Sequence, residues 1–120
     1  MPNLPDYDWV KIAPLPDAGK ELIARNTVAR LEVAGKTLYL ANYEGSYYAG
    51  NARCPHAGGA LDKGRLSADG CVVCPLHRFC FNLQSGKEQT VEGFSVPVYP
   101  VKQADDGFYI GFPKNKWWFW

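Results

Sequence analysis

The sequence has little net charge and no long apolar segment. Lysine and arginine total 13, and aspartate and glutamate total 12, so the 120 residues carry a formal net charge of +1. Such a balanced chain lacks the positive surface that attracts nucleic acids or anionic membranes. Its apolar runs are far too short for a membrane-spanning helix, and its start, MPNLPDYDWV, lacks the apolar stretch of a secretory signal peptide. We therefore expect a cytoplasmic protein with no nucleic-acid or membrane partner.

Histidine and cysteine are also scarce. The chain has two histidines, His56 and His77, and four cysteines, at positions 54, 71, 74 and 80. In a chain without a signal peptide we expect these cysteines to be reduced thiols, for which metal or redox roles are more common than disulfides. These six residues therefore limit the metal and redox chemistry that the chain can perform.

The composition indicates one all-β domain with many turns. The chain is 47% hydrophobic and 21% charged, with twelve glycines and nine prolines, which is typical of a folded globule with short elements. Alternating patterns and turn residues predict roughly six to nine short strands in a sandwich or barrel. The strands are expected at residues 8–13, 27–33, 36–42, 46–52, 71–73, 95–102 and 107–112, whereas 21–25 is ambiguous between strand and helix.

Both histidines lie within three residues of a cysteine, in two short motifs. Cys54-Pro55-His56 is followed, after 17 intervening residues, by Cys74-Pro75-Leu76-His77. Two thiolates and two imidazoles can hold a structural zinc ion or a [2Fe–2S] cluster with two cysteines on one iron and two histidines on the other. The order Cys, His, Cys, His favours a cluster gripped between two loops, because each loop then gives one ligand to each iron.

The segments RCPHAGG at 53–59, DGCVVCPLH at 69–77 and FNLQSG at 81–86 resemble a Rieske domain. The resemblance is closest to soluble Rieske-type ferredoxins and to the small-subunit-like proteins of nitrite reductase systems. It implies an antiparallel β-sandwich over residues 8–112, with a small cluster-binding subdomain at about 52–84. An extended lead at 1–7 and an aromatic tail at 113–120 flank this domain.

The resemblance also implies the ligands and the partners of this site. Cys54 and Cys74 would hold the inner iron of a [2Fe–2S] cluster, and His56 and His77 would hold the outer iron near the surface. The expected function is one-electron transfer between a flavoprotein reductase and a terminal oxygenase or reductase, by transient contacts. A small subunit of a nitrite-reductase-like enzyme and a zinc-stabilised interaction module are the alternatives.

The chain itself is not expected to be an enzyme. The large subunits of Rieske oxygenases carry a further iron that needs two more histidines and a carboxylate, and this chain has no histidine to spare. It also has no GxGxxG motif for a flavin or nicotinamide cofactor. Chemistry on a substrate is therefore expected in a partner protein.

Departures from the family pattern point to a low reduction potential. Respiratory-chain Rieske proteins brace their loops with a disulfide, and the matching positions here are Gly59 and Leu76. The same relatives place a serine and a tyrosine that donate hydrogen bonds to cluster sulfurs, where this chain has Phe79 and Phe81. Fewer hydrogen bonds to sulfur disfavour the reduced cluster. We therefore expect a potential toward the low end of the Rieske range.

The remaining candidate residues surround the two motifs. Cys71 and Cys80 are expected to be core thiols rather than reactive nucleophiles. Aromatic side chains near the motifs are expected to exclude water from the inner iron: Tyr47, Tyr48, Phe79 and Phe81. Four cations could steer an acidic partner, or could simply be solvated: Arg53, Lys63, Arg65 and Arg78. The final residues, Trp117, Trp118, Phe119 and Trp120, fit either a docking or membrane-surface tag, or a tail that folds back over the domain or makes a dimer contact.

Overall fold

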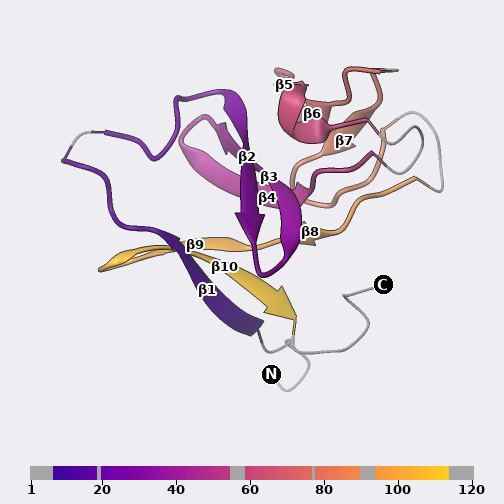
Figure 1. Cartoon of the computed structure of the whole chain (residues 1–120). Helices are drawn as coiled ribbons and strands as arrows, with labels where there is room; N and C mark the ends of the chain where they lie inside the picture. Colours follow the sequence, from indigo (N-terminus) through magenta and orange to yellow (C-terminus); the bar gives the residue numbers. More distant parts are fainter. Residues whose placement is uncertain (1–6, 19, 55–58, 77, 90–93, 114–120) are drawn as a thin grey trace.

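The computed structural model describes residues 7–18, 20–54, 59–76, 78–89 and 94–113. Within these ranges the chain forms ten β-strands in three antiparallel sheets and one short 3-10 helix (Figure 1). The all-β expectation is confirmed. No helix in the described ranges is long and apolar enough to cross a membrane. The tail at 114–120 lies outside these ranges.

The three sheets differ in the part of the chain that builds them. The first sheet has the order β1 (Tyr7–Ala13), β10 (Gly107–Pro113), β9 (Val101–Ala104). The second has the order β2 (Thr27–Val33), β3 (Lys36–Tyr43), β4 (Ser46–Asn51), β8 (Val98–Tyr99). The third has the order β5 (Arg65–Leu66), β6 (Cys71–Val73), β7 (Cys80–Asn82), and the helix η1 (Leu61–Lys63) precedes it.

The hairpin of β2 and β3 forms where its sequence predicts. The two strands pair from Thr27↔Asn42 to Val33↔Lys36. The turn residues Ala34 and Gly35 both have positive φ angles, 54° and 77°. Two consecutive residues of this kind match the right-handed twist of the strands, which is why such turns connect tight hairpins.

Strand β3 lies between two hydrophobic cores because its side chains alternate between the two faces of the sheet. Leu38 and Leu40 point into a core that includes Ile110 and Phe112. Tyr39 and Ala41 point into a second core, which contains two of the four cysteines. Strand β3 thus contributes side chains both to the core beside the first sheet and to the core beside the third sheet.

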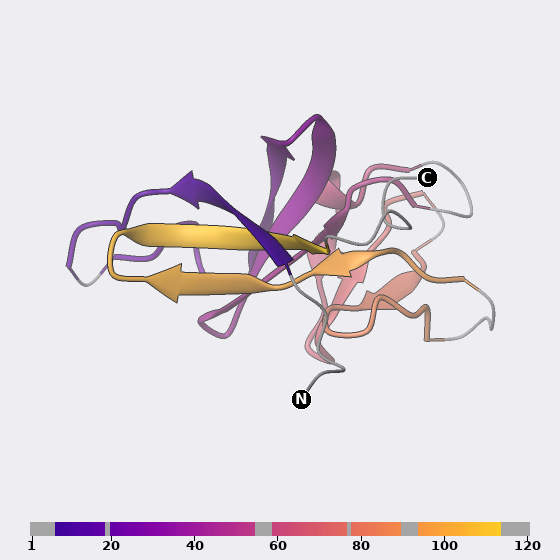
Figure 2. The same cartoon turned by 90° about the horizontal axis from the view of Figure 1, so that it is seen from below.

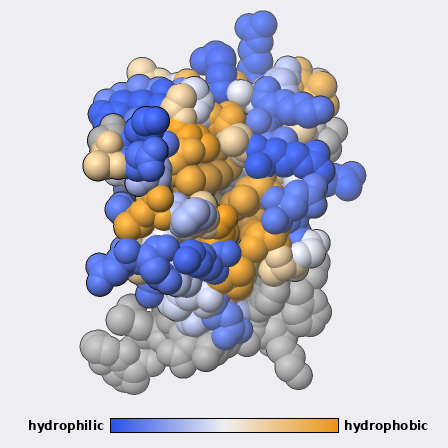
Figure 3. All heavy atoms as spheres, turned by 60° about the vertical axis from the view of Figure 1, so that its left-hand side comes forward, coloured by the Kyte–Doolittle hydropathy of each residue, from blue (hydrophilic) through white to orange (hydrophobic). Residues whose placement is uncertain are grey.

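The first and third sheets lie at opposite ends of the molecule (Figures 1 and 2). Tyr7 pairs with Pro113, so the first sheet extends one residue beyond the expected limits of 8 and 112. On one side face, hydrophobic atoms form a band between hydrophilic side chains (Figure 3). Some apolar residues are therefore exposed on that face.

Some predicted elements were wrong in detail. Residues 95–102 do not form one strand, because β8 and β9 belong to different sheets and Pro100 lies between them. Proline has no N–H to continue a ladder, but its carbonyl accepts a 3.0 Å hydrogen bond from the Gly111 N–H. The ambiguous segment 21–25 forms neither strand nor helix. The sequence patterns also did not predict η1, β5 and β7.

Candidate metal centre

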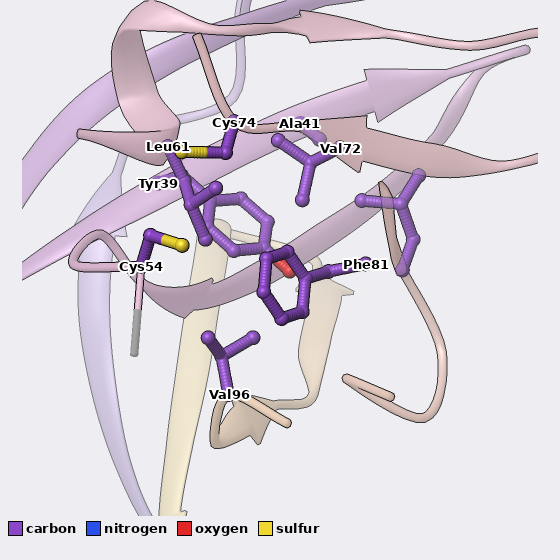
Figure 4. Packing of buried hydrophobic residues seen from close by; sticks show 9 residues of the cluster. Tyr39, Ala41, Cys54, Leu61, Val72, Cys74, Phe81 and Val96 are labelled. Carbon is purple, nitrogen blue, oxygen red and sulfur yellow. The ribbon is translucent and has the colours of Figure 1, made fainter. Parts of the chain in front are cut away.

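Two cysteines of the two sequence motifs lie in one buried cluster. Cys54 is 1% exposed and Cys74 is fully buried. Both pack with Tyr39, Leu61 and Phe81 in the core beside the third sheet. Figure 4 shows the two sulfur atoms next to Leu61 and the ring of Tyr39. The structure therefore brings together two thiols that are 20 positions apart in the sequence.

Each of these cysteines begins a loop that is closed at its base in the same way. The Cys54 N–H donates to the Gly59 carbonyl over 2.8 Å, and the Cys74 N–H donates to the Phe79 carbonyl over 2.8 Å. The acceptor is five positions after the cysteine in both loops. His56 and His77 belong to these two loops by sequence, but both lie outside the described residues. Their role as ligands stays a prediction.

The space beside the Cys74 sulfur requires a glycine on the facing loop. A Cβ atom at Gly59 would come within 2.8 Å of Cys74 Sγ and 3.0 Å of Leu76 Cγ. Real Cβ atoms essentially never approach so closely, so a side chain at this position would displace the sulfur or the loop. Two buried sulfurs, a glycine that keeps the loops close, and two imidazoles in the same loops by sequence fit a [2Fe–2S] cluster of mixed ligation.

The aromatic residues near the motifs divide between the two cores. Phe81 is fully buried, and Phe79 and Tyr48 pack against the same core as the two cysteines. These three therefore line the core that holds the two cysteines, and the exclusion of water from the inner iron stays a prediction. Tyr47 was assigned wrongly, because its ring stacks edge-on against Phe108 at 5.0 Å in the other core. Tyr47 and Tyr48 are neighbours on a strand, so their side chains point to opposite faces.

Tyr39 is a site residue that the motifs did not identify. Its side chain is fully buried beside the two cysteines, and burial raises the pKa of its hydroxyl. That hydroxyl has no hydrogen-bond partner among the described residues. The sequence did contain a signal for Tyr39. In the strand KTLYLAN at 36–42, side chains alternate between the two faces, so Tyr39 lies on the opposite face from Leu38 and Leu40.

The other two cysteines form a separate contact behind the second loop. Cys71 is fully buried, its backbone N–H donates to Ser67 Oγ over 3.3 Å, and the same Ser67 oxygen lies 3.8 Å from Cys80 Sγ. Burial, followed by the Cys80 contact, raises the pKa of Cys71 to about 12. No disulfide joins any of the four cysteines, all of which lie in the described residues. A thiol with so high a pKa is a poor nucleophile, so the expectation that Cys71 is a core residue is confirmed.

Three of the four candidate cations lie around one hollow. Lys63, Arg65 and Arg78 line a cavity of about 230 Å³ together with Cys74 and Pro75. Arg53 lies apart from them, beside a second hollow that Arg30 also lines. The structure thus groups residues from η1, β5 and the second loop next to a buried sulfur.

Comparison with known proteins places this geometry in a family. The model of the Rieske [2Fe-2S] domain matches residues 9–100. The chain belongs to this family, and its cofactor is a [2Fe–2S] cluster. It is 34% identical over 76 residues to the ferredoxin subunit of 3-phenylpropionate/cinnamic acid dioxygenase from Escherichia coli K12, covering 62% of this chain and 72% of that protein.

Two solved structures share the fold. The ferredoxin of carbazole 1,9a-dioxygenase from Nocardioides aromaticivorans IC177 superposes with a TM-score of 0.73 at 24% identity, over 88% of this chain and 98% of that one. A putative NADH-dependent nitrite reductase small subunit from Mycobacterium tuberculosis gives a TM-score of 0.77 at 21% identity, over 91% and 98% of the two chains. Both similarities support the expected Rieske architecture.

Proposed function

We propose that Cys54, His56, Cys74 and His77 hold the [2Fe–2S] cluster. The two cysteines hold the inner iron, and the two histidines hold the outer iron. The observation that carries this assignment is the pair of buried sulfurs at the start of two loops with matching base closure. The segment 52–84, which includes both loops and the third sheet, is the cluster-binding subdomain.

The chain acts as a one-electron carrier rather than as an enzyme. When bound, the cluster supplies reversible one-electron chemistry. The chain's own residues keep water from the inner sulfurs and hold the two loops close together at Gly59. The E. coli relative is named as the ferredoxin subunit of a dioxygenase, which supports a terminal oxygenase as electron acceptor. A flavoprotein reductase is the corresponding donor.

A second role is favoured by one observation. The nitrite reductase small subunit has a higher TM-score, 0.77, than the carbazole dioxygenase ferredoxin, 0.73. A permanent subunit would co-purify with its enzyme as a stable complex, whereas a free carrier would elute alone.

We place the carrier in the cytoplasm, because four cysteines with no disulfide are typical of a reducing compartment.

Visible absorption and electron paramagnetic resonance spectra of protein purified without oxygen test the cluster assignment. A red-brown oxidised form should bleach with dithionite and give a reduced-state signal of low average g value. Iron and sulfide analysis should give two of each per chain. A colourless protein with one zinc per chain, after reconstitution with iron and sulfide has failed, would contradict the proposal and favour the zinc-stabilised module.

A further inference from the structure

The hollow beside Cys74 carries positive charge without a matching carboxylate. Lys63, Arg65 and Arg78 are all exposed at its rim. The ion pairs found in the described part of the chain use Lys11, Lys20, Arg25 and Arg30, and none of the three rim cations. The whole chain carries only +1, so the positive field at this hollow is local.

The backbone holds the segment that carries two of the three cations beside the hollow. Arg65 pairs with Val73 in the third sheet, and Gly64 packs so closely on the Val73 carbonyl that a Cβ there would overlap it. This contact holds the segment carrying Lys63 and Arg65 against the strand that ends at Cys74. A flexible surface segment would not keep two cations beside one buried sulfur.

Arg78 is placed by an uncommon backbone conformation. Its φ angle is 59°, in the left-handed region that residues other than glycine rarely adopt. The Arg78 N–H donates to the Cys74 carbonyl over 2.8 Å, which closes the second loop. The same turn that positions the ligand loop therefore sets where the Arg78 side chain leaves the backbone.

The loop after Cys74 exposes two apolar residues, of which Pro75 lines the hollow with the rim cations and Leu76 follows it in the sequence. Pro75 is exposed and lines the hollow, and Leu76 is 59% exposed. An apolar centre with a charged rim is the usual composition of a protein–protein interface. Three cations on an almost neutral chain are too few for general attraction to polyanions, and they fit the small, salt-sensitive contacts of electron-transfer partners.

We propose that this hollow is the docking site for an electron-transfer protein that presents clustered carboxylates. The inference rests on the proposed function, because the partner gains access to the cluster from the Cys74 side of the second loop. Lys63, Arg65 and Arg78 pair with the partner's carboxylates, and Pro75 and Leu76 form the apolar centre of the contact.

Small charged oxidants measure the local field on the cluster-loaded protein. The reduced cluster gives one electron to ferricyanide, which becomes ferrocyanide, or to the cationic tris(phenanthroline)cobalt(III), which becomes cobalt(II). Stopped-flow rates at low ionic strength should fall roughly fivefold to twentyfold with ferricyanide in Arg65→Glu and Arg78→Glu, and rise with the cobalt complex. A change in the cluster's own potential would alter both rates in the same direction. The ratio of the ferricyanide rate to the cobalt rate therefore reports the local charge rather than the potential.

Matched charge reversals provide the control. Lys20→Glu and Lys102→Glu change the net charge equally but lie in the 14–26 loop and in β9, outside the cluster-binding subdomain. Their rate ratios should stay within about twofold of the wild type, and all differences should shrink in 0.5 M salt, where screening acts over only a few ångströms. Equal effects at the control and rim positions would overturn the proposal.

A carboxylate peptide tests docking directly. Hexaglutamate should slow the oxidation by ferricyanide in the wild type, whereas hexalysine at the same ionic strength should not. Arg65→Glu and Lys63→Glu should abolish this competition. Each variant is first shown to carry the reduced-state resonance signal, so that loss of the cluster, which would count against the proposed function, is distinguished from loss of docking. A loaded wild type that hexaglutamate does not inhibit would contradict the proposal.

Discussion

At the residue scale, four cysteines that look alike in composition have two different environments. Cys54 and Cys74 share a core with Tyr39 and begin the two loops that we propose hold the cluster, whereas Cys71 contacts Cys80. The motif spacing distinguished the two groups. The depth of burial and the thiol–thiol contact could not be predicted, because both depend on how β6 pairs with β7.

Alanine substitutions separate the ligand cysteines from the core cysteines. Cys54→Ala and Cys74→Ala should lose the cluster, since each removes one of the two thiolates of the inner iron. Cys71→Ala and Cys80→Ala should keep two irons per chain and the visible spectrum of the wild type. Iron and sulfide analysis of the four proteins measures the difference. Cluster loss in Cys71→Ala at an unchanged circular dichroism spectrum would contradict the ligand assignment.

The approach of the two loops at Gly59 predicts a second effect. In Gly59→Ala the added Cβ would lie 2.8 Å from Cys74 Sγ, so the variant should bind substoichiometric iron or lose its cluster several times faster in air. The bleaching rate of the visible band measures this. Gly35→Ala is the control, because its strain comes from a φ of 77° in a remote turn with no atom within 4 Å of the added Cβ. Its cluster should bleach at the wild-type rate.

The raised pKa of Cys71 predicts a loss of stability at alkaline pH. In the unfolded chain the thiol ionises at its ordinary value of 9.0, and in the folded protein at about 12. Between these values the unfolded state binds fewer protons, so the free energy of unfolding decreases as pH rises from about 9 to 12. Below pH 9 the contribution of the protonated thiol is fully present. Removing the thiol should abolish this part of the pH dependence.

Denaturant midpoints of the wild type and Cys71→Ala measure this linkage. The wild type should be the more stable protein at pH 8, since the variant loses a buried side chain. The gap between the two midpoints should narrow at pH 10.5. A gap of constant size across this range would show that Cys71 ionises with the same pKa in both states.

At the element scale, periodicity was sufficient for the longer strands, and the apolar run 71–73 predicted the short strand β6, but no pattern predicted β5 and β7. The patterns of β1, β2, β3 and β10 predicted these strands to within a residue or two of their observed ends. Strand β5 has two residues and β7 has three, too few to show an alternation. They form because their partner, β6, is held between them, and such tertiary pairing leaves little signal in a single sequence.

The position of Phe81 in strand β7 predicts a low reduction potential for the cluster. Phe81 lies in the core with Cys54 and Cys74, the two proposed ligands, and its side chain has no hydrogen-bond donor. The wild-type potential should therefore lie below zero, in the lower part of the range of about −150 to +300 mV known for Rieske centres. Phe81→Tyr should raise it, because a hydroxyl that donates to a cluster sulfur favours the reduced state.

Redox titration followed by the visible band measures these potentials. Tyr109→Phe is a suitable control, because it removes a hydroxyl that donates to the Asp106 carboxylate in the turn between β9 and β10. It should leave the potential unchanged. A wild-type potential well above zero would contradict the argument from missing donors.

At the scale of the whole molecule, the two cores predict a local response to cluster removal. The core with Leu38, Leu40 and Ile110 contains none of the cysteines, whereas the core of the third sheet contains both proposed ligand cysteines. Metal binding contributes folding free energy to the part of a protein that holds the ligands. Removing the cluster should therefore loosen the third sheet and its loops, while β1, β9 and β10 stay folded.

Hydrogen–deuterium exchange of the loaded and cluster-free proteins measures this response. Amides of β5, β6 and β7 should exchange much faster without the cluster, and amides of β1 and β10 should keep their protection, since exchange reports the free energy of opening for each cooperative unit. The exchange rates of the β3 amides distinguish local from global unfolding, because Tyr39 faces one core and Leu38 faces the other. Intermediate protection of β3 agrees with two units that share a strand. Equal loss of protection in β1 and β6 would show that the cluster holds the whole chain together, and that the two cores unfold as one.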